Sequence, residues 1–348
     1  MSRSQTSAVA LLIAVAVMTN APAEAQPKVA EAGNALTSVW HLGRVTGNLD
    51  AIVEFYCDVV GLDFRGDREE PITFYSVATI NEFTGSPPDA EFRAAFLPIP
   101  GSAPNGQSAD AIYLEALEYR HIDRRLQIPR LSDIGVTSLR FVVSDLATTL
   151  VALGTQDIKI VTAGGDPIAI MPPPGYSGAA SAVMVRDPDG YPVELVAVAG
   201  LSPGPIGAQM TLIVADLPAA LNAMGQLIGG ELATIDVRDW SVRTDTSRLR
   251  DIEPAESRSA AVVLPASSIV LELIEFRGIS QSRYEPKFQD IGFGHVAFRT
   301  NDIARVTATI AALGADTLSA TGTWTQINDS TRAVYTRDPN GLFIEVIE

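Results

Sequence analysis

Short apolar runs, with either alternating or β-branched residues, recur along the chain and are separated by turn sequences. Such runs of four to eight residues are typical of β-strands. Asp-Pro-Asp-Gly at 187–190 and Asp-Pro-Asn-Gly at 338–341 are turn signals that bound two of them. The pattern predicts strands at residues 112–117, 182–185 and 268–272, among others.

Residues 292–302, GFGHVAFRTND, combine a strand with the start of a helix. Because side chains alternate between the faces of a strand, His295, Ala297 and Arg299 share one face and the apolar residues the other. Asp302 is placed to cap the helix predicted over residues 303–313. One of only three histidines in the chain therefore points away from the apolar face.

In residues 48–62 the apolar positions follow a different period from that of the strands. These positions recur every three to four residues, which predicts an amphipathic helix. Cys57, the single cysteine, lies inside it and cannot form an internal disulfide. We interpret it as a half-buried helix residue. The apolar positions are Leu49, Ile52, Val53, Tyr56 and Val60.

The chain also resembles itself at fixed offsets, which indicates internal repeats. Residues 120–135 match residues 277–292 at an offset of 157 without a gap. Two further matches occur, at 151 for residues 186–196 and at 168 for residues 48 onward. The sequence is thus two similar halves, each of two similar modules, and each module is predicted to be βαβββ. The offsets pair Glu115 with Glu272, Ser138 with His295, Glu194 with Glu345, and His41 with Gln209.

Composition agrees with a globular protein of two domains. The 348 residues are 47% hydrophobic and 19% charged, which is ample for a packed core. A net charge of −16 without a basic cluster argues against binding to nucleic acid or to anionic membranes. Thiol and serine hydrolases lack support, because the sequence has no Cys-His cluster and no Gly-x-Ser-x-Gly elbow.

The first residues have the pattern of a secretory signal peptide. Arg3 precedes an apolar run, and Ala23-Glu24-Ala25 matches a cleavage site. We therefore expect a periplasmic or secreted protein with no membrane segment after cleavage. The predicted organisation is a signal peptide at 1–25, a flexible lead-in at 26–36, a first domain at 37–200, a linker at 201–207 and a second domain at 208–348.

Some polar segments have ordinary interpretations. Glu118 and Glu275 fall on the strand face opposite to Glu115 and Glu272, so we expect them to be solvated. His121 lies in a basic loop and is expected to be exposed. Arg44 and Arg299 are either exposed or face a pocket. The Pro-rich residues 164–178 form a surface loop or a lid over a pocket.

Three sequence features carry a resemblance to a known family. They are His41 followed by Asn48-Leu49, the stretch FYCDVVGLDF at 55–64, and the closing sequences DPDGYPVEL and DPNGLFIEV. The chain resembles the vicinal oxygen chelate (VOC) superfamily, which includes glyoxalase I, extradiol dioxygenases and bleomycin-resistance proteins. The resemblance implies an α+β fold in which four βαβββ modules form two VOC domains with cupped mixed sheets.

It also implies a metal site. In this superfamily a module can contribute one ligand from its first strand and a carboxylate from its last. If the first and fourth modules face each other, the ligands are His41, Glu115, His295 and Glu345, the arrangement that we favour. If neighbouring modules pair, the set is Gln209, Glu272, His295 and Glu345. Imidazole and carboxylate ligands suit one divalent ion such as Zn, Ni, Fe, Co or Mn.

The expected function is a metal-dependent, glyoxalase-like lyase or isomerase, active on a small molecule with neighbouring oxygens. Glu345 or Glu115 would move the proton. One alternative is an Fe(II) extradiol-type dioxygenase that uses His41, His295 and Glu345. A second alternative is a metal-free binding protein similar to bleomycin-resistance proteins. A single chain can supply both halves of a site, so we expect a monomer or a homodimer.

Overall fold

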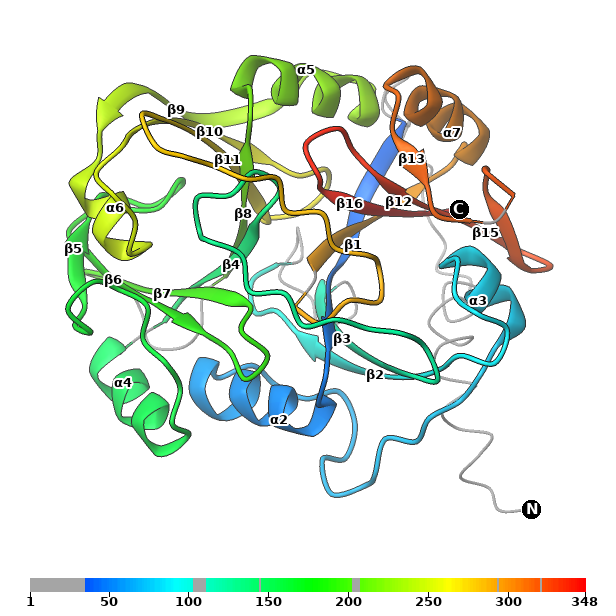
Figure 1. Cartoon of the computed structure of the whole chain (residues 1–348), viewed down its shortest axis with the longest axis horizontal. Coiled ribbons are helices and arrows are strands. Elements are labelled where there is room, and N and C mark those ends of the chain that lie inside the picture. Colours follow the sequence, from blue (N-terminus) through cyan, green and yellow to red (C-terminus); the bar gives the residue numbers. More distant parts are fainter. Residues whose placement is uncertain (1–34, 103–110, 144, 202–206, 293, 320) are drawn as a thin grey trace.

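The computed structural model describes residues 35–102, 111–143, 145–201, 207–292, 294–319 and 321–348 (Figure 1). The predicted signal peptide and most of the lead-in lie outside these residues, as do residues 202–206 of the linker. Ala35 and Leu36, at the end of the predicted lead-in, are buried and belong to the folded part. In the described part of the chain, no helix is long and apolar enough to cross a membrane.

The chain folds into four consecutive modules, and each begins with a strand and a helix and ends with further strands. The first contains β1 (Leu36–Thr46), α2 (Leu49–Glu54), a π-helix η2 (Phe55–Val60), α3 (Ala78–Phe83), β2 (Glu91–Pro98) and β3 (Tyr113–Arg120). The second contains β4 (Thr137–Val142), α4 (Leu146–Thr155), β5 (Ile168–Ile170), β6 (Ala180–Arg186) and β7 (Pro192–Val198).

The third module contains β8 (Ala208–Val214), α5 (Leu217–Ile228), β9 (Ala233–Val242), α6 (Thr244–Leu249), β10 (Glu256–Val263) and β11 (Val270–Arg277). The fourth contains β12 (Gly294–Thr300), α7 (Ile303–Ala312), β13 (Asp316–Thr317), β14 (Thr325–Asn328), β15 (Thr331–Arg337) and β16 (Phe343–Ile347).

These strands form two mixed sheets, and each sheet takes strands from both halves of the sequence. The first has the order β13-β15-β16-β12-β1-β3-β2, with β14 paired to β15. The second has the order β5-β6-β7-β4-β8-β11-β10-β9. Antiparallel pairing of β1 with β12 joins the first and fourth modules, and β4 with β8 joins the second and third. The favoured module pairing is confirmed, and the fold is α+β as predicted.

Helices α2, α4, α5 and α7 pack between the two sheets. In Figure 1, α5 and α7 lie together along one side of the molecule, and α2 and α4 lie along the other. The largest buried cluster contains residues of both sheets, including Leu42 of β1 and Met210 of β8, together with Ile52 of α2 and Val306 of α7. The convex faces of the sheets are therefore covered by apolar packing, and their concave faces remain available for sites.

The first module departs from the predicted βαβββ pattern. Between η2 and β2 it has the helix α3 and a single bridge between Tyr75 and Phe92, where a strand was expected. Residues 65–71, RGDREEP, are mostly charged and carry no alternating apolar face. Such a segment cannot cover a sheet edge with apolar side chains, so the chain leaves the sheet there.

Helix α7 is capped as its sequence predicts. Asp302 accepts a hydrogen bond from Arg305 N at 3.0 Å, which confirms its expected role. Glu118 and Glu275 were expected to be solvated, and this was wrong. Their Oε2 atoms accept hydrogen bonds from Leu49 N and Leu217 N at 2.9 and 2.8 Å, because a helix N-terminus leaves N–H groups without helical partners.

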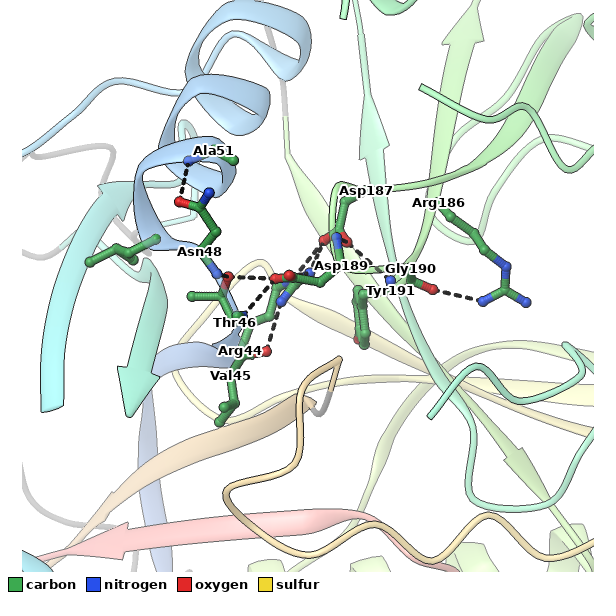
Figure 2. Close-up of polar contacts among 12 residues, drawn as sticks. Arg44, Val45, Thr46, Asn48, Ala51, Arg186, Asp187, Asp189, Gly190 and Tyr191 are labelled. Atoms are coloured by element: carbon green, nitrogen blue, oxygen red, sulfur yellow. Dashed lines mark hydrogen bonds and ion pairs between the residues drawn. The ribbon is translucent and has the colours of Figure 1, made fainter. Parts of the chain in front are cut away.

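Arg44 is neither exposed nor in a pocket, contrary to both expectations. Figure 2 shows it among polar partners from the turn after β6. It is fully buried, and its Nε donates to Asp187 Oδ2 at 2.6 Å. Asp189 Oδ2 accepts a hydrogen bond from Gly47 N and also contacts Arg44 and Thr46. This ion-pair network connects β1 of the first sheet to the second sheet. His121, by contrast, is exposed as expected.

Candidate metal centre

Four adjacent strands of the first sheet carry the four predicted ligands. His41 lies on β1, Glu115 on β3, His295 on β12 and Glu345 on β16. In the strand register, Gly43 of β1 is opposite both Glu115 and His295. Side chains on neighbouring strands at such positions lie on the same face of the sheet. The two histidines and two glutamates therefore converge on the concave side, at the junction of the first and fourth modules.

Two small residues make room for this convergence. Ala297 is opposite both His41 and Glu345 in the register, and Gly43 faces the ring of His295. A Cβ atom added to Gly43 would lie 1.7 Å from His295 Cε1, closer than any van der Waals contact allows. Position 43 therefore requires glycine while the imidazole occupies its present place.

The ligand atoms are close together and buried. His41 Nε2 lies 3.0 Å from His295 Nε2, 3.0 Å from Glu345 Oε2 and 3.1 Å from Glu115 Oε2. His295 Nε2 lies 3.6 Å from Glu345 Oε2 and 3.8 Å from Glu115 Oε2. The exposed fractions of the four residues are 0–7%. Two carboxylates thus share a small buried volume with two imidazoles.

The electrostatics reflect this crowding. Burial alone would lower the pKa of His41, but attraction to Glu115 and Glu345 outweighs it and raises the pKa to about 10. Burial, with the nearby His41, lowers the pKa of His295 well below its ordinary value. Burial raises the pKa of Glu345, although His41 opposes this shift. The two buried carboxylates therefore favour positive charge at the centre of the cluster.

The arrangement fits a single divalent ion. Four ligand atoms, each about 2.1 Å from one ion, lie roughly 3.0–3.4 Å apart in octahedral or tetrahedral coordination. The separations here are 3.0–3.8 Å, and the candidate ligand atoms of all four residues lie within 4.8 Å of one another. Two carboxylates also balance the charge of a divalent ion. His41, Glu115, His295 and Glu345 could therefore hold such an ion.

A cavity opens from this cluster, and its walls are mostly aromatic and aliphatic. Helix α3, which replaces the expected strand, contributes Ile80 and Phe83 to the wall. Trp40 adjoins His41, and Ile327 comes from β14. The other aromatic rings of the wall come from β2, β3, β15 and the segment before β12, and they are Phe92, Phe96, Tyr119, Phe288 and Tyr335.

The structure does not bring together the alternative ligand set. Gln209 on β8 and Glu272 on β11 belong to the second sheet, whereas His295 and Glu345 belong to the first. Gln209 and Glu272 lie instead with Ser138 and Glu194 on the second sheet, and all four are buried. We call the two concave sites the first cup, which contains His41, and the second cup, which contains Gln209.

Comparison with known proteins agrees with this architecture. The model of the Glyoxalase/Bleomycin resistance protein/Dioxygenase superfamily matches residues 38–195 and 208–346. The chain belongs to this superfamily. A protein of Brassica oleracea var. gemmifera, assigned as a lactoylglutathione lyase, is 26% identical over 263 residues, which cover 73% of this chain and 72% of that protein. The domain boundaries at 200 and 208 stay a prediction.

Two solved structures share the fold of this chain. Glyoxalase I from Zea mays is 18% identical, with a TM-score of 0.57 over 89% of this chain and 92% of that chain. A Bacillus subtilis protein assigned as a dioxygenase is 14% identical, with a TM-score of 0.51 over 90% of this chain and 86% of that chain. At these identities the likeness extends to the fold alone.

Sequence reasoning missed two contributors to the cups. Arg140, which lies in the second cup, was not singled out, although the offset of 157 aligns it with Ala297 and exposes an alanine-to-arginine difference. The α3 wall was missed because residues 78–83, ATINEF, are too short to give a helical period. The first of these had a signal in the sequence, and the second had none.

Proposed function

We propose that this protein is a divalent-metal-dependent lyase or isomerase that acts on a small, largely apolar molecule with two neighbouring oxygens. The observation that carries the proposal is the convergence of His41, Glu115, His295 and Glu345 within 4.8 Å in one buried cup. An ion such as Zn, Ni, Fe, Co or Mn, once bound there, supplies a Lewis acid for the two oxygens.

The two glutamates are the proton-transfer candidates. Glu345 Oε2 and Glu115 Oε2 lie at nearly equal distances from His41, 3.0 and 3.1 Å, on either side of the cluster. A carboxylate on the edge of the cavity can take a proton from one carbon of the substrate and return it to the neighbouring carbon. We therefore assign the proton transfer to Glu345 or Glu115.

The cavity walls determine the proposed substrate class. Among the described residues, no lysine or arginine lines the cavity of the first cup. A carboxylate on the substrate would lose its hydration there without gaining a cationic partner, which is costly. Apolar or aromatic groups would pack against Phe83, Phe92 and Tyr335 instead. We therefore favour a neutral substrate over an adduct of glutathione, whose two carboxylates need cations.

The two alternative functions require different residues of the first cup. An extradiol-type Fe(II) dioxygenase needs His41, His295 and Glu345, and would leave Glu115 without a role although it lies equally close. A metal-free binding protein would use the apolar walls alone, and these walls favour it as the second candidate. Metal content separates the first two functions from the third.

Location and assembly are part of the proposal. The signal-peptide pattern in residues 1–25 supports export to the periplasm or beyond. Glutathione is chiefly cytosolic, so export also favours a substrate that needs no such thiol. Strands β1, β3, β12 and β16 of one chain supply all four ligand residues, so the proposed site needs no second chain.

The deciding experiment is metal analysis of the purified mature protein by mass spectrometry, beside His295→Ala and His121→Ala. We expect stoichiometric metal in the wild type and in His121→Ala, whose ring lies on the surface, and loss of metal in His295→Ala. Phenylglyoxal would then be offered to the loaded protein with and without glutathione. Absence of metal after reconstitution with all five ions would leave only the binding protein.

A further inference from the structure

The second cup repeats the strand register of the first cup residue by residue. In the first cup, Gly43 is opposite His295 and Glu115, and Ala297 is opposite His41 and Glu345. In the second cup, Thr211 is opposite Ser138 and Glu272, and Arg140 is opposite Gln209 and Glu194. The two glutamates are retained, but an arginine stands in the place of Ala297.

The guanidinium of Arg140 contacts three of the four residues that correspond to the metal ligands. Its Nη1 donates to Gln209 Oε1 at 2.8 Å and to Glu272 Oε2 at 2.9 Å. Its Nε lies 2.8 Å from Glu194 Oε1. Arginine is well suited to this position because its planar fork can engage two carboxylates at once. The fourth residue, Ser138, bonds to Thr211 instead.

The second cup keeps a small cavity, but bulkier side chains stand beside its ligand positions. Where the first cup has glycine and alanine beside its ligands, the second has Thr211 and Arg140, which are 0% and 7% exposed. Residues 171–176 of the Pro-rich loop close it, since Gln209 Nε2 donates to Pro174 O at 2.7 Å. Arg238 Nη2 holds the same loop through Pro172 O at 3.0 Å. The loop that the sequence left as either a lid or a surface loop therefore covers this cup.

The charges of the second cup balance without an ion. Glu194 and Glu272 are 1% and 4% exposed, and Arg140 with the buried Arg250 supplies two cations against them. Arg250 donates to Leu131 O and to Thr211 Oγ1, both at 3.2 Å. A divalent ion would add uncompensated charge to this buried, charge-balanced site, which is unfavourable. Among the described residues, no arginine or lysine lines the cavity of the first cup.

We infer that the Arg140 guanidinium takes the place of the metal ion in the second cup. The second cup therefore becomes a second divalent-metal site when Arg140 is removed and the ligand geometry of the first cup is restored. The site would take the same class of borderline divalent cation, held by Glu194, Glu272, Gln209 and a histidine at position 138. The inference uses the proposed metal centre as its template, but it can be tested separately.

The test measures Mn²⁺ binding in a His41→Ala/His295→Ala background, in which the first cup has lost both imidazoles. We expect no binding in this parent, because its second cup is unchanged. Adding Ser138→His, Arg140→Ala and Thr211→Gly should produce stoichiometric binding, together with a Mn²⁺-dependent rise in melting temperature. Thr211→Gly is needed because the ring of His295 requires Gly43 at the equivalent position. The matched control replaces Arg140→Ala by Arg140→Lys, which keeps the cation and should stay metal-free.

Two results would overturn the inference. One is Mn²⁺ binding in the parent that disappears with Glu194→Gln, because Arg140 would then not exclude the ion. The other is a redesigned chain, refolded with Mn²⁺ present or absent, that takes up no ion. Failure of the proposed function looks different, since it would appear as wild-type protein that binds no metal while the redesigned second cup binds its ion.

Discussion

Asp133 and Asp290 accept hydrogen bonds from each other's segment in equivalent ways. Asp133 Oδ1 accepts from Ser282 N at 2.8 Å, and Asp290 Oδ1 accepts from Arg125 N at 3.0 Å. Both pairs of equivalent residues are related by the offset of 157 that the sequence shows. The segments before β4 and before β12 therefore cross as symmetric partners, and each carboxylate fastens one half of the chain to the other.

Asp290→Asn tests this fastening through its pH dependence. Burial would raise the pKa of Asp290, but N–H groups of Lys287 and Arg125 outweigh this and lower it. A lowered pKa means stability that is present above the unfolded value of about 3.9 and is lost as pH falls through the folded value. At pH 7 we expect the substitution to lower the free energy of unfolding by about 1–3 kcal/mol. Urea titrations from pH 7 to pH 3 would measure it.

The difference between wild type and Asp290→Asn should shrink as pH falls below about 3.9, because the unfolded carboxylate binds a proton there while the native one stays charged down to its lower pKa. Asp316→Asn is the control, because the side chain of Asp316 is 76% exposed and its loss should change stability by less than about 0.5 kcal/mol. A difference for Asp290→Asn that is constant over the whole pH range would show that its charge is not what the segment needs.

Arg44→Met should be among the most damaging single changes in the protein. It leaves Asp187 buried beside Tyr56 without its cation, and removing one partner of a buried ion pair costs about 3–5 kcal/mol. Thermal and chemical unfolding would measure the loss. Arg44→Met/Asp187→Asn removes both charges, and we expect it to be more stable than Arg44→Met alone.

Arg68→Ala provides the comparison for a surface ion pair. Arg68 and Asp58 make a 2.8 Å contact, but their side chains are 41% and 48% exposed. Water and salt screen such a pair, so its loss should cost no more than about 1 kcal/mol. Equal losses for Arg44→Met and Arg68→Ala would contradict the view that the buried network joins the sheets.

The sequence predicts the features of this protein that its internal repeats encode, and it does not predict those that depend on packing between the halves. The offsets of 151, 157 and 168 align every ligand of the first cup with its counterpart, so the histidine and glutamate positions could be proposed from sequence alone. The sequence does not decide which modules share a sheet, because the pairing of β1 with β12 depends on packing between the two halves. Arg44 shows the same limit, since its partner Asp187 lies 143 residues away on the other sheet.

Gly43→Ala should disable the first cup while leaving the fold largely intact. The added Cβ would lie 1.7 Å from His295 Cε1, so the imidazole must leave its place among the ligand atoms. We expect metal affinity to fall at least about tenfold, because ligand orientation controls affinity. Gly154→Ala is the matched control, as nothing lies within 4 Å of the new methyl group and it should bind metal normally. Unchanged affinity in Gly43→Ala would mean that His295 is not a ligand.

The variants Glu115→Gln and Glu345→Gln distinguish a role as metal ligand from a role as general base. Each amide keeps the shape of the carboxylate but loses the charge that a divalent ion and a proton both need, so both variants should bind metal more weakly than wild type. At saturating metal, the variant that lacks the base should still lose about 10²–10⁴-fold in kcat, whereas the other should recover most of its activity. The measurement is kcat against metal concentration for each variant with a neutral vicinal dicarbonyl substrate. Full recovery of both variants would remove the two glutamates from the proton-transfer step and leave them as ligands only.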